Sequence, residues 1–349
     1  MNSECLRTLQ AQAPDRLASF EKYYCGKRVL ITGGLGFIGS TLAIALADLG
    51  ARVTLVDSMI PEYGGNLFNI SPVRDRVTVN ISDVRDRSSM NYLVQGCDCL
   101  FNLAGTLSHV DSMTDPFTDL EINCVSQLSI LEACRRHNPG IKIGFAGTRG
   151  QYGRTGPDPV REDTPMRPVD VNGINNVAGE AYHLLYHEVH GIRAFSLRLT
   201  NTYGPRHQMR HHRQGVLNWF LRLLIEGKTV KLYGNGRQIR DTNYVDDVVE
   251  AFLLAMADDR AAGQVFNLGG EPVSLMDFVE QAIRVHGGGS YELVEYPAEA
   301  KPIEIGDYRA DWSRIRDTLG WHPRVALAEG IARTLEYYKQ HRQHYWDTP

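Results

Sequence analysis

A glycine-rich turn near residue 33 constrains the fold of this chain more than any other feature. Gly33, Gly36 and Gly39 follow a short β-branched run at 28–32 and precede an apolar helical pattern at 37–49. Glycines at this spacing permit a tight turn and let a phosphate group approach the N-terminus of the next helix. Strand, turn and helix in this order predict the first unit of a parallel sheet that binds a dinucleotide.

Short apolar runs and helical patterns alternate as far as about residue 204. Each run has the length and the β-branched content of a strand, and a helical segment separates it from the next. The predicted strands are residues 28–32, 52–56, 76–79, 99–103, 142–146 and 193–198. We therefore predict an α/β fold with a doubly wound parallel sheet of the Rossmann type.

The alternation ends at Gly204 and Pro205, and the break predicts a smaller, interleaved C-terminal α/β domain. Helices are expected at 216–226, 245–255 and 327–341, and strands at 265–268 and 291–294. The predicted division gives residues 27–204 to the dinucleotide-binding domain, with 241–270 returning to it, and 205–240 and 271–349 to the second domain. Residues 1–26 are expected to be an extension with one short helix at 15–24.

Composition and charge exclude several classes of protein. The chain has 349 residues, of which 43% are hydrophobic and 22% charged, and its formal net charge is -4. The chain lacks the excess of basic residues that would indicate nucleic acid or an anionic membrane surface as a partner. Since it has no apolar run long enough to span a membrane and no signal-peptide pattern, we expect a cytoplasmic protein.

The six cysteines do not form a metal-binding pattern. Cys97 and Cys99 lie at the start of a predicted strand, where alternation would put both thiols on one face. No second Cys or His pair has the spacing of a zinc site, so buried thiols and no metal are predicted.

The residue that ends the second predicted strand bears on the choice of dinucleotide. Asp57 lies about 20 residues beyond the glycine turn, where a carboxylate can accept hydrogen bonds from the adenosine ribose. The same charge would repel a 2′-phosphate, which favours NAD over NADP.

Several further motifs follow the glycine turn over residues 27–338. They are Asp83-Val84, Asn102 to Gly105, Thr200 to Pro205, Arg240 to Asp246, Phe266 to Gly270 and Leu319 to Pro323. Together they resemble the extended short-chain dehydrogenase/reductase family, in particular its NAD-dependent nucleotide-sugar epimerases and dehydratases. The resemblance implies NAD as cofactor and a nucleoside diphosphate (NDP) sugar as substrate. The cofactor-binding residues it implies are Gly33, Leu35, Gly36, Phe37, Ile38, Gly39, Asp57, Asp83, Val84, Leu103, Ala104, Gly105, Asn123 and Asn176.

The resemblance also implies a substrate site in the second domain. The residues expected there are His109, Asp111, Asn201, Val216, Tyr233, Arg240 and Asn267. Arg240 would clasp the diphosphate, although a surface ion pair with Asp241 is an alternative. Asn267 could equally be a turn residue, and the nucleotide base stays open. The arginines and histidines at 206–213 form either a basic lid or a solvated loop.

The acid/base pair of the family is missing from this chain. In the family a Tyr-x-x-x-Lys pair stands where this sequence has Asn172 and Asn176. The tyrosine removes a hydroxyl proton from the sugar, which an asparagine amide cannot do. Asn176 could still bond the nicotinamide ribose. Thr148 matches the third catalytic member of the family.

Other residues could replace the missing pair. Tyr152 and His109 with Asp111 are candidates, since a histidine can exchange protons near neutral pH. Each also occurs in ordinary relatives, so a structural role is the alternative. Glu62 and Tyr63 are weaker candidates. Arg149 and Gly150 stand where 4,6-dehydratases carry an acidic pair, which argues against that reaction.

Three functions remain open from the sequence. The first is an NAD-dependent NDP-hexose epimerase acting through transient oxidation with an atypical acid/base set. The second is a dehydratase, decarboxylase or dehydrogenase on the same scaffold, and the third is an inactive protein that binds NAD and an NDP-sugar. By analogy with the family we also expect a homodimer through helices at 119–136 and 177–190.

Overall fold

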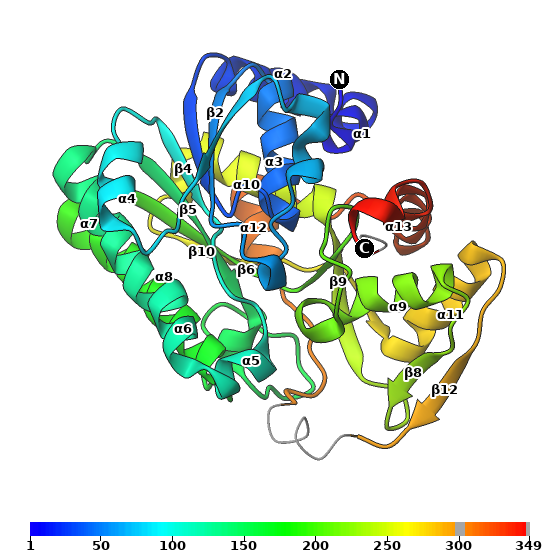
Figure 1. Ribbon diagram of the computed structural model, residues 1–349. Coiled ribbons are helices and arrows are strands. Elements are labelled where there is room, and N and C mark those ends of the chain that lie inside the picture. Colours follow the sequence, from blue (N-terminus) through cyan, green and yellow to red (C-terminus); the bar gives the residue numbers. More distant parts are fainter. Residues whose placement is uncertain (297–303, 347–349) are drawn as a thin grey trace.

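A parallel sheet of seven strands forms the centre of the computed structural model, which describes residues 1–296 and 304–346 (Figure 1). In spatial order its strands are β10 (Val265–Asn267), β6 (Arg193–Leu199), β5 (Lys142–Thr148), β4 (Cys99–Asn102), β1 (Arg28–Thr32), β2 (Arg52–Asp57) and β3 (Val77–Ile81). β1 pairs with β2 on one side and with β4 on the other, so the winding direction reverses at β1. The predicted fold class is confirmed, and this reversal is where open α/β sheets bind ligands.

Helices cover both faces of the sheet, which explains why its strands are apolar on both sides (Figure 1). One face packs against α3 (Phe37–Asp48) and α10 (Val245–Ala257). The other packs against α4 (Arg87–Leu93), α7 (Ser126–His137) and α8 (Val171–His190). α3 begins at the glycine turn, so the sheet and both helix layers fix the position of that turn.

The N-terminal residues form two helices rather than the single one predicted. α2 (Pro14–Tyr24) agrees with the expected helix, and α1 (Glu4–Gln12) precedes it. Both pack on α10, and the Tyr24 hydroxyl donates a hydrogen bond of 2.7 Å to the carbonyl oxygen of Leu253. Since Leu6, Leu9 and Phe20 are buried in the same core as α10, this segment is an integral layer of the fold.

The second part of the chain has its own small sheets and core. β7 (Asn201–Tyr203), β9 (Ile239–Tyr244) and β11 (Glu271–Ser274) form one sheet, and β8 (Val230–Tyr233) pairs with β12 (Tyr291–Val294). α9 (Val216–Ile225), α11 (Leu275–His286) and α13 (Leu327–His341) enclose their core. α12 (Ser313–Leu319) packs in the core of the large sheet instead. Sequence patterns did not indicate the short strands β7, β8, β9 and β11.

The helix predicted at 119–136 is present and contains one π turn. α6 (Pro116–Leu120), the π turn (Glu121–Val125) and α7 follow one another without a break in helical backbone. α5 (His109–Thr114) precedes them and contacts α8. A single π turn inside an α-helix often marks a functional site. The remaining short turns are η1 (Pro61–Tyr63), η2 (Leu67–Val73), η4 (Arg149–Tyr152), η5 (His212–Gln214), η6 (Asp259–Ala261) and η8 (Arg342–His344).

Candidate active site

A cavity lies beside the glycine turn, between the carboxyl ends of the sheet strands and the second part of the chain. The second part contributes Thr200, Asn201, Thr202 and the loop from His207 to Gly215. Leu35 was predicted to bind the cofactor, but its buried side chain does not line the cavity. The other predicted cofactor residues line it, namely Gly33, Gly36, Phe37, Ile38, Gly39, Asp57, Asp83, Val84, Leu103, Ala104, Gly105, Asn123 and Asn176.

Close backbone contacts explain the glycines of the turn. Gly33 has a φ of +66°, a conformation that disfavours other residues. A β-carbon on Gly39 would lie 2.2 Å from the carbonyl oxygen of Gly33. Gly36 is the N-cap of α3, whose first backbone N–H groups have no partner within the helix. The turn therefore fits the pyrophosphate of a dinucleotide.

Asp57 holds its carboxylate at the cavity by two backbone hydrogen bonds. Its Oδ2 accepts from the backbone N–H of Leu35 at 3.0 Å, and its Oδ1 from that of Met59 at 2.9 Å. Burial raises the pKa of Asp57 above its ordinary value, against the lowering effect of these two bonds. A carboxylate so placed at the end of β2 suits ribose hydroxyls and disfavours a phosphate.

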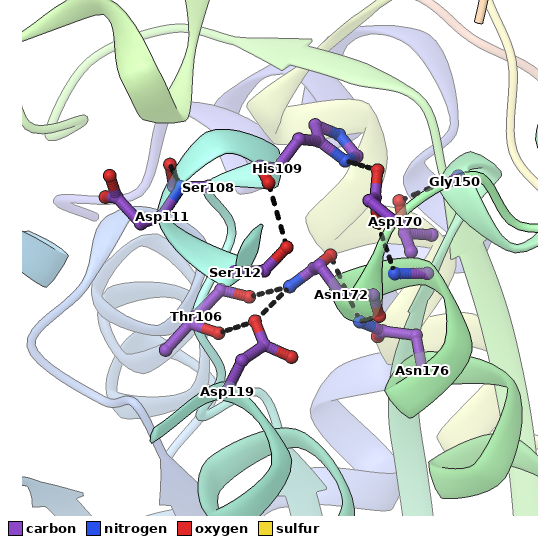
Figure 2. A network of polar contacts seen from close by, with 12 residues as sticks. Thr106, Ser108, His109, Asp111, Ser112, Asp119, Gly150, Asp170, Asn172 and Asn176 are labelled. Atoms are coloured by element: carbon purple, nitrogen blue, oxygen red, sulfur yellow. Dashed lines mark hydrogen bonds and ion pairs between the residues drawn. The ribbon is translucent and has the colours of Figure 1, made fainter. Parts of the chain in front are cut away.

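Asn172 and Asn176 both line the cavity, but their amides bind each other and the surrounding protein (Figure 2). Asn172 Nδ2 donates to the carbonyl oxygen of Thr106 at 2.8 Å and to Asp119 Oδ2 at 3.0 Å. Asn176 Nδ2 donates to the carbonyl oxygen of Asn172 at 2.9 Å. Neither asparagine can exchange a proton with a ligand near neutral pH, so other residues must supply any acid/base chemistry.

Asp119 is the buried centre of this network. Its oxygens accept hydrogen bonds from Thr106 Oγ1 at 2.5 Å and from Asn175 Nδ2 at 2.8 Å, besides that from Asn172. Asn123, in the π turn, donates to Thr106 Oγ1 at 2.6 Å. Sequence reasoning missed Asp119 and Asn175. The three-residue spacing of Asn172 and Asn175, which share a helix face, was the signal that could have indicated a shared partner.

His109 and Asp170 form a hydrogen-bonded pair (Figure 2). His109 Nδ1 lies 2.6 Å from Asp170 Oδ2, and Asp170 Oδ1 caps α8 by accepting from the N–H of Gly173 at 2.7 Å. Burial raises the pKa of Asp170, but hydrogen bonds and the charge of His109 hold it below its ordinary value. His109 lines the cavity, and its Nε2 has no partner among the described residues.

Thr148, at the end of β5, lies close to the ring of His109. A β-carbon on Gly150 would lie 3.3 Å from His109 Cε1 and 3.5 Å from Thr148 Oγ1. Both side chains line the cavity. A glycine at position 150 therefore leaves the space in which the imidazole and the hydroxyl can approach one ligand.

Tyr152, a predicted catalytic residue, and Asn267, a predicted substrate residue, lie in the interior. The Tyr152 hydroxyl donates to Asn267 Oδ1 at 2.6 Å and accepts from Arg198 Nη1 at 2.5 Å. Neither residue lines the cavity, because each is fully used in this buried network. The structure thus corrects the placement of both, and Tyr152 is removed as a replacement acid or base.

Four other predicted substrate residues do not line the cavity either. Arg240 pairs with Glu304 at 2.8 Å, so its charge is already neutralised. Asp111 pairs with Arg213 at 2.9 Å and points away from Asn172 (Figure 2). Tyr233 lies on the exposed side of β8, and Val216 begins α9 just behind the cavity wall. Asn201 does line the cavity, and its buried Oδ1 has no partner among the described residues.

The arginine- and histidine-rich segment at 206–213 is partly buried and tied to its surroundings. His207 is buried, and its Nδ1 and Nε2 lie 2.6 and 3.3 Å from the carbonyl oxygens of Gln208 and Gln214. Gln214 donates to the carbonyl oxygen of Glu62 at 2.9 Å, which links this segment to the other side of the cavity. The two ends of this loop therefore line the cavity, at His207–Gln208 and Gln214–Gly215, whereas Arg210, His212 and Arg213 are exposed.

No group of His, Cys, Asp and Glu side chains in residues 1–296 and 304–346 has the arrangement of a metal site. Cys99 is buried in β4, and Cys97 lies before that strand and is partly exposed. Within the same ranges no helix is long and apolar enough to cross a membrane.

The sheet, the glycine turn at its reversal point and the aspartate after β2 define a dinucleotide-binding α/β protein. The chain belongs to the NAD-dependent epimerase/dehydratase family, whose model matches residues 29–269. The predicted family and the predicted cofactor, NAD, are thereby confirmed.

Relatives of two reaction types resemble the chain over most of its length. A UDP-glucose 4-epimerase of Mycolicibacterium smegmatis is 33% identical over 320 residues, which are 90% of this chain and 100% of the relative. A dTDP-glucose 4,6-dehydratase of Streptomyces niveus is 29% identical over 330 residues, 92% and 95% of the two chains. The structure of a Thermotoga maritima UDP-glucose 4-epimerase with UDP-glucose has a TM-score of 0.81 and 28% identity, and the match covers 90% of this chain and 99% of that one. These likenesses support an enzyme of the epimerase or dehydratase type.

Proposed function

We propose that the protein is an NAD-dependent epimerase of an NDP-hexose and that His109 replaces the missing tyrosine. Two of the epimerases that it resembles act on UDP-glucose, by their names, and this chain shares the fold of the second. The observation that carries the proposal is the pair of His109 and Asp170 at 2.6 Å, beside Thr148 in the cavity.

The His109–Asp170 pair has the geometry of a general base and its positioning residue. When the neutral ring has its hydrogen on Nδ1 and donates a hydrogen bond to Asp170 Oδ2, the lone pair on Nε2 is free to accept a proton. Nε2 would then hold the proton released from a sugar hydroxyl and return it later. Asp170 stabilises the charged imidazolium in between, as the carboxylate of a catalytic triad does.

The other cavity residues would bind and orient the ligands. NAD, when bound, takes up a hydride from the sugar carbon and returns it. Thr148 Oγ1 would donate a hydrogen bond to the sugar oxygen that changes from a hydroxyl to a carbonyl during the oxidation. The free Oδ1 of Asn201 would accept a hydrogen bond from a sugar hydroxyl. Asn176, without the positive charge of a lysine, would contribute only hydrogen bonds to the nicotinamide ribose.

Dehydration is the second candidate, because some relatives are 4,6-dehydratases. Eliminating water needs an acid to protonate the leaving hydroxyl. The two residues after Thr148 are Arg149 and Gly150, and neither can serve as that acid near neutral pH. Epimerisation needs no such group, so it agrees better with the residues present.

The test is turnover of UDP-, GDP-, CDP- and dTDP-hexoses with NAD, followed by isomer-resolving chromatography and mass detection. We expect a new peak of unchanged mass with the wild type. His109→Gln should reduce kcat by about 100-fold or more, which is within the range for losing a general base. His137→Gln, a change on the exposed end of α7, is the matched control.

Asp170→Asn separates catalysis from folding, because asparagine is also a good helix N-cap. This variant should fold normally, bind NAD and lose most of its turnover, with a pH–rate profile different from that of the wild type. A product lighter by one water would instead establish the dehydratase. Binding of an NDP-sugar without any product would identify an inactive binding protein.

We further propose that the protein is a homodimer through the surface of α6 and α8. Side chains that are large, apolar and exposed gather on these helices and on the π turn after α6. They are Phe117, Leu120, Val125, Ile174, Leu185 and Val189. An apolar surface of this kind indicates a protein interface. Size-exclusion chromatography with light scattering should give twice the mass of one chain, and Phe117→Asp should give a monomer.

A further inference from the structure

Arg149 is a partly buried cation at the wall of the cavity, and its Nη1 lacks a hydrogen-bond acceptor within the described part of the chain. It follows Thr148 directly, begins the turn η4 and lines the cavity. Its Nη1 is inaccessible to solvent and has no hydrogen-bond partner among the described residues. The proposed epimerase chemistry does not use this side chain.

The acidic groups around Arg149 are already committed to other partners. Glu304 accepts from Arg240 Nη2 at 2.8 Å and from the Tyr296 hydroxyl at 2.9 Å. Asp241 accepts from the backbone N–H of Gly270 at 2.5 Å and from that of Ala310 at 2.7 Å. Asp170, the third carboxylate, pairs with His109. None of these three carboxylates forms an ion pair with Arg149.

The ring of Tyr308 offers Arg149 only partial compensation. The guanidinium carbon lies 5.6 Å from the ring centroid, and the Tyr308 hydroxyl is itself buried without a partner. A cation–π contact offsets only part of the cost of desolvating a charge. Burial, and next the charge of Arg240, lowers the pKa of Arg149 to about 10, so it is still charged at neutral pH.

An anion bound at the cavity would compensate this charge through Nε and Nη2 of Arg149, because Nη1 itself is closed to solvent. We propose that Arg149 binds a carboxylate on the hexose, so that the substrate is a nucleotide-linked uronic acid. This inference rests on the proposed function and names its substrate class. A guanidinium binds a planar carboxylate through two parallel hydrogen bonds, whereas a neutral hydroxymethyl group leaves the charge unpaired.

The place of Arg149 in the turn favours the sugar over the diphosphate as the source of the anion. The residue lies between Thr148, which lines the cavity, and Gly150, on which a β-carbon would lie 3.3 Å from His109 Cε1. Its backbone therefore belongs to the part of the cavity where the sugar would react. The diphosphate of the substrate is the other source of negative charge, and the experiment distinguishes the two.

The experiment measures binding by calorimetry in the presence of NAD, so that it does not depend on turnover. The probes are UDP-, dTDP-, CDP- and GDP-hexoses, each paired with its 6-carboxylate counterpart, and the free nucleoside diphosphates. In the wild type one uronate should bind more tightly than its neutral partner by on the order of ten- to a hundredfold, the range for a charged hydrogen-bonded pair.

Two variants of Arg149 complete the test. Arg149→Met should abolish the preference for the uronate while leaving the affinity for the neutral hexose and the free diphosphate unchanged. Arg149→Lys, which keeps the charge but not the planar fork, should restore part of the preference. NAD affinity and the thermal midpoint report whether each variant has folded.

Three results would overturn the inference. Equal or tighter binding of the neutral sugars by the wild type is one, and absence of uronate binding in every series is another. A loss of affinity for the free diphosphate in Arg149→Met would assign the side chain to the phosphates. Uronate binding that depends on Arg149 without any epimerised product would refute the proposed function and leave this inference standing.

Discussion

The amide of Asn172 donates a hydrogen bond of 3.0 Å to Asp119 Oδ2, across the contact between α8 and α6. Asn172, which the sequence analysis predicts to stand in place of the family's catalytic tyrosine, is thus a structural partner of a buried carboxylate. Asn175 donates to the other oxygen of the same carboxylate at 2.8 Å. Two amides from one helix face hold Asp119, and this arrangement depends on an amide at position 172.

Restoring the family pair should therefore harm the protein instead of improving it. Asn172→Tyr removes one donor to Asp119 and one to the carbonyl oxygen of Thr106, which we expect to destabilise the fold by about 1–3 kcal/mol. With Asn176→Lys added, turnover should fall by at least tenfold, since the new groups compete with His109. Urea unfolding and the chromatographic assay measure the two effects.

Asn176→Lys alone is the control for this experiment, because it leaves the contacts of Asn172 with Asp119 and Thr106 in place. A rise in turnover of the double variant above that of the wild type would contradict the assignment of His109. It would show that the protein is an epimerase with a decayed acid/base pair.

Asp57 should determine the preference for NAD. Asp57→Asn removes the negative charge and keeps an oxygen for one of the two backbone N–H groups, of Leu35 and Met59, that bind the carboxylate. We expect the ratio of NAD to NADP affinity to fall on the order of ten- to a hundredfold, as repulsion of the 2′-phosphate disappears. Fluorescence titration with both dinucleotides measures the ratio, and an unchanged ratio would refute this role.

Local sequence signals were sufficient for the large sheet and the glycine turn. Gly33, Gly39 and Asp57 lie in one short stretch, so strand, turn and helix could be read together, and most residues predicted from this pattern line the cavity. The short strands β7, β9 and β11 could not be recognised, because pairing between distant segments rather than local composition stabilises them.

The substrate side was harder to predict for the same reason. Tyr152 and Asn267 are 115 residues apart, and Arg240 and Glu304 are 64 apart, so the partners that hold them in the interior or neutralise them are invisible to spacing rules. His109 was recognised as a candidate, but Asp170, its partner at a separation of 61 residues, was not. Whether a candidate residue reaches the cavity therefore depends on hydrogen bonds and ion pairs between side chains that are far apart in the sequence.

The N-terminal helices should contribute to global stability. Phe20 is buried on α2 and meets the ring of Tyr24 edge-on, with ring centroids 6.2 Å apart. Phe20→Ala should destabilise the protein by about 3–5 kcal/mol, the usual range for a buried phenylalanine. Glu21→Ala, an exposed change on the same helix, should alter stability by less than about 0.5 kcal/mol. Equal urea midpoints for the two variants would show that α2 unfolds independently.

Stability should decrease as the pH falls from about 6.5 to about 4, because of buried neutral histidines. His183 is fully buried, stacks on Phe145 at 4.5 Å, and has Nδ1 2.7 Å from the carbonyl oxygen of Gly179. Burial lowers its pKa to about 4, against the raising effects of that hydrogen bond and of Glu180. The unfolded chain therefore binds a proton in this range that the folded chain excludes.

His183→Gln removes the titrating group, so the difference in stability between the wild type and this variant reports the contribution of His183 at each pH. At pH 7 the variant should be less stable than the wild type, because the stacking on Phe145 is lost. Between pH 7 and pH 5 the wild type should lose more stability than the variant, by about 1.4 kcal/mol for each unit of pKa difference that is titrated. The gap in unfolding free energy should thus narrow on acidification. A gap that stays constant or widens would mean that His183 is protonated in the folded protein. In that case His183 Nε2 could not accept a hydrogen bond from Asn102 Nδ2, which lies 3.2 Å away.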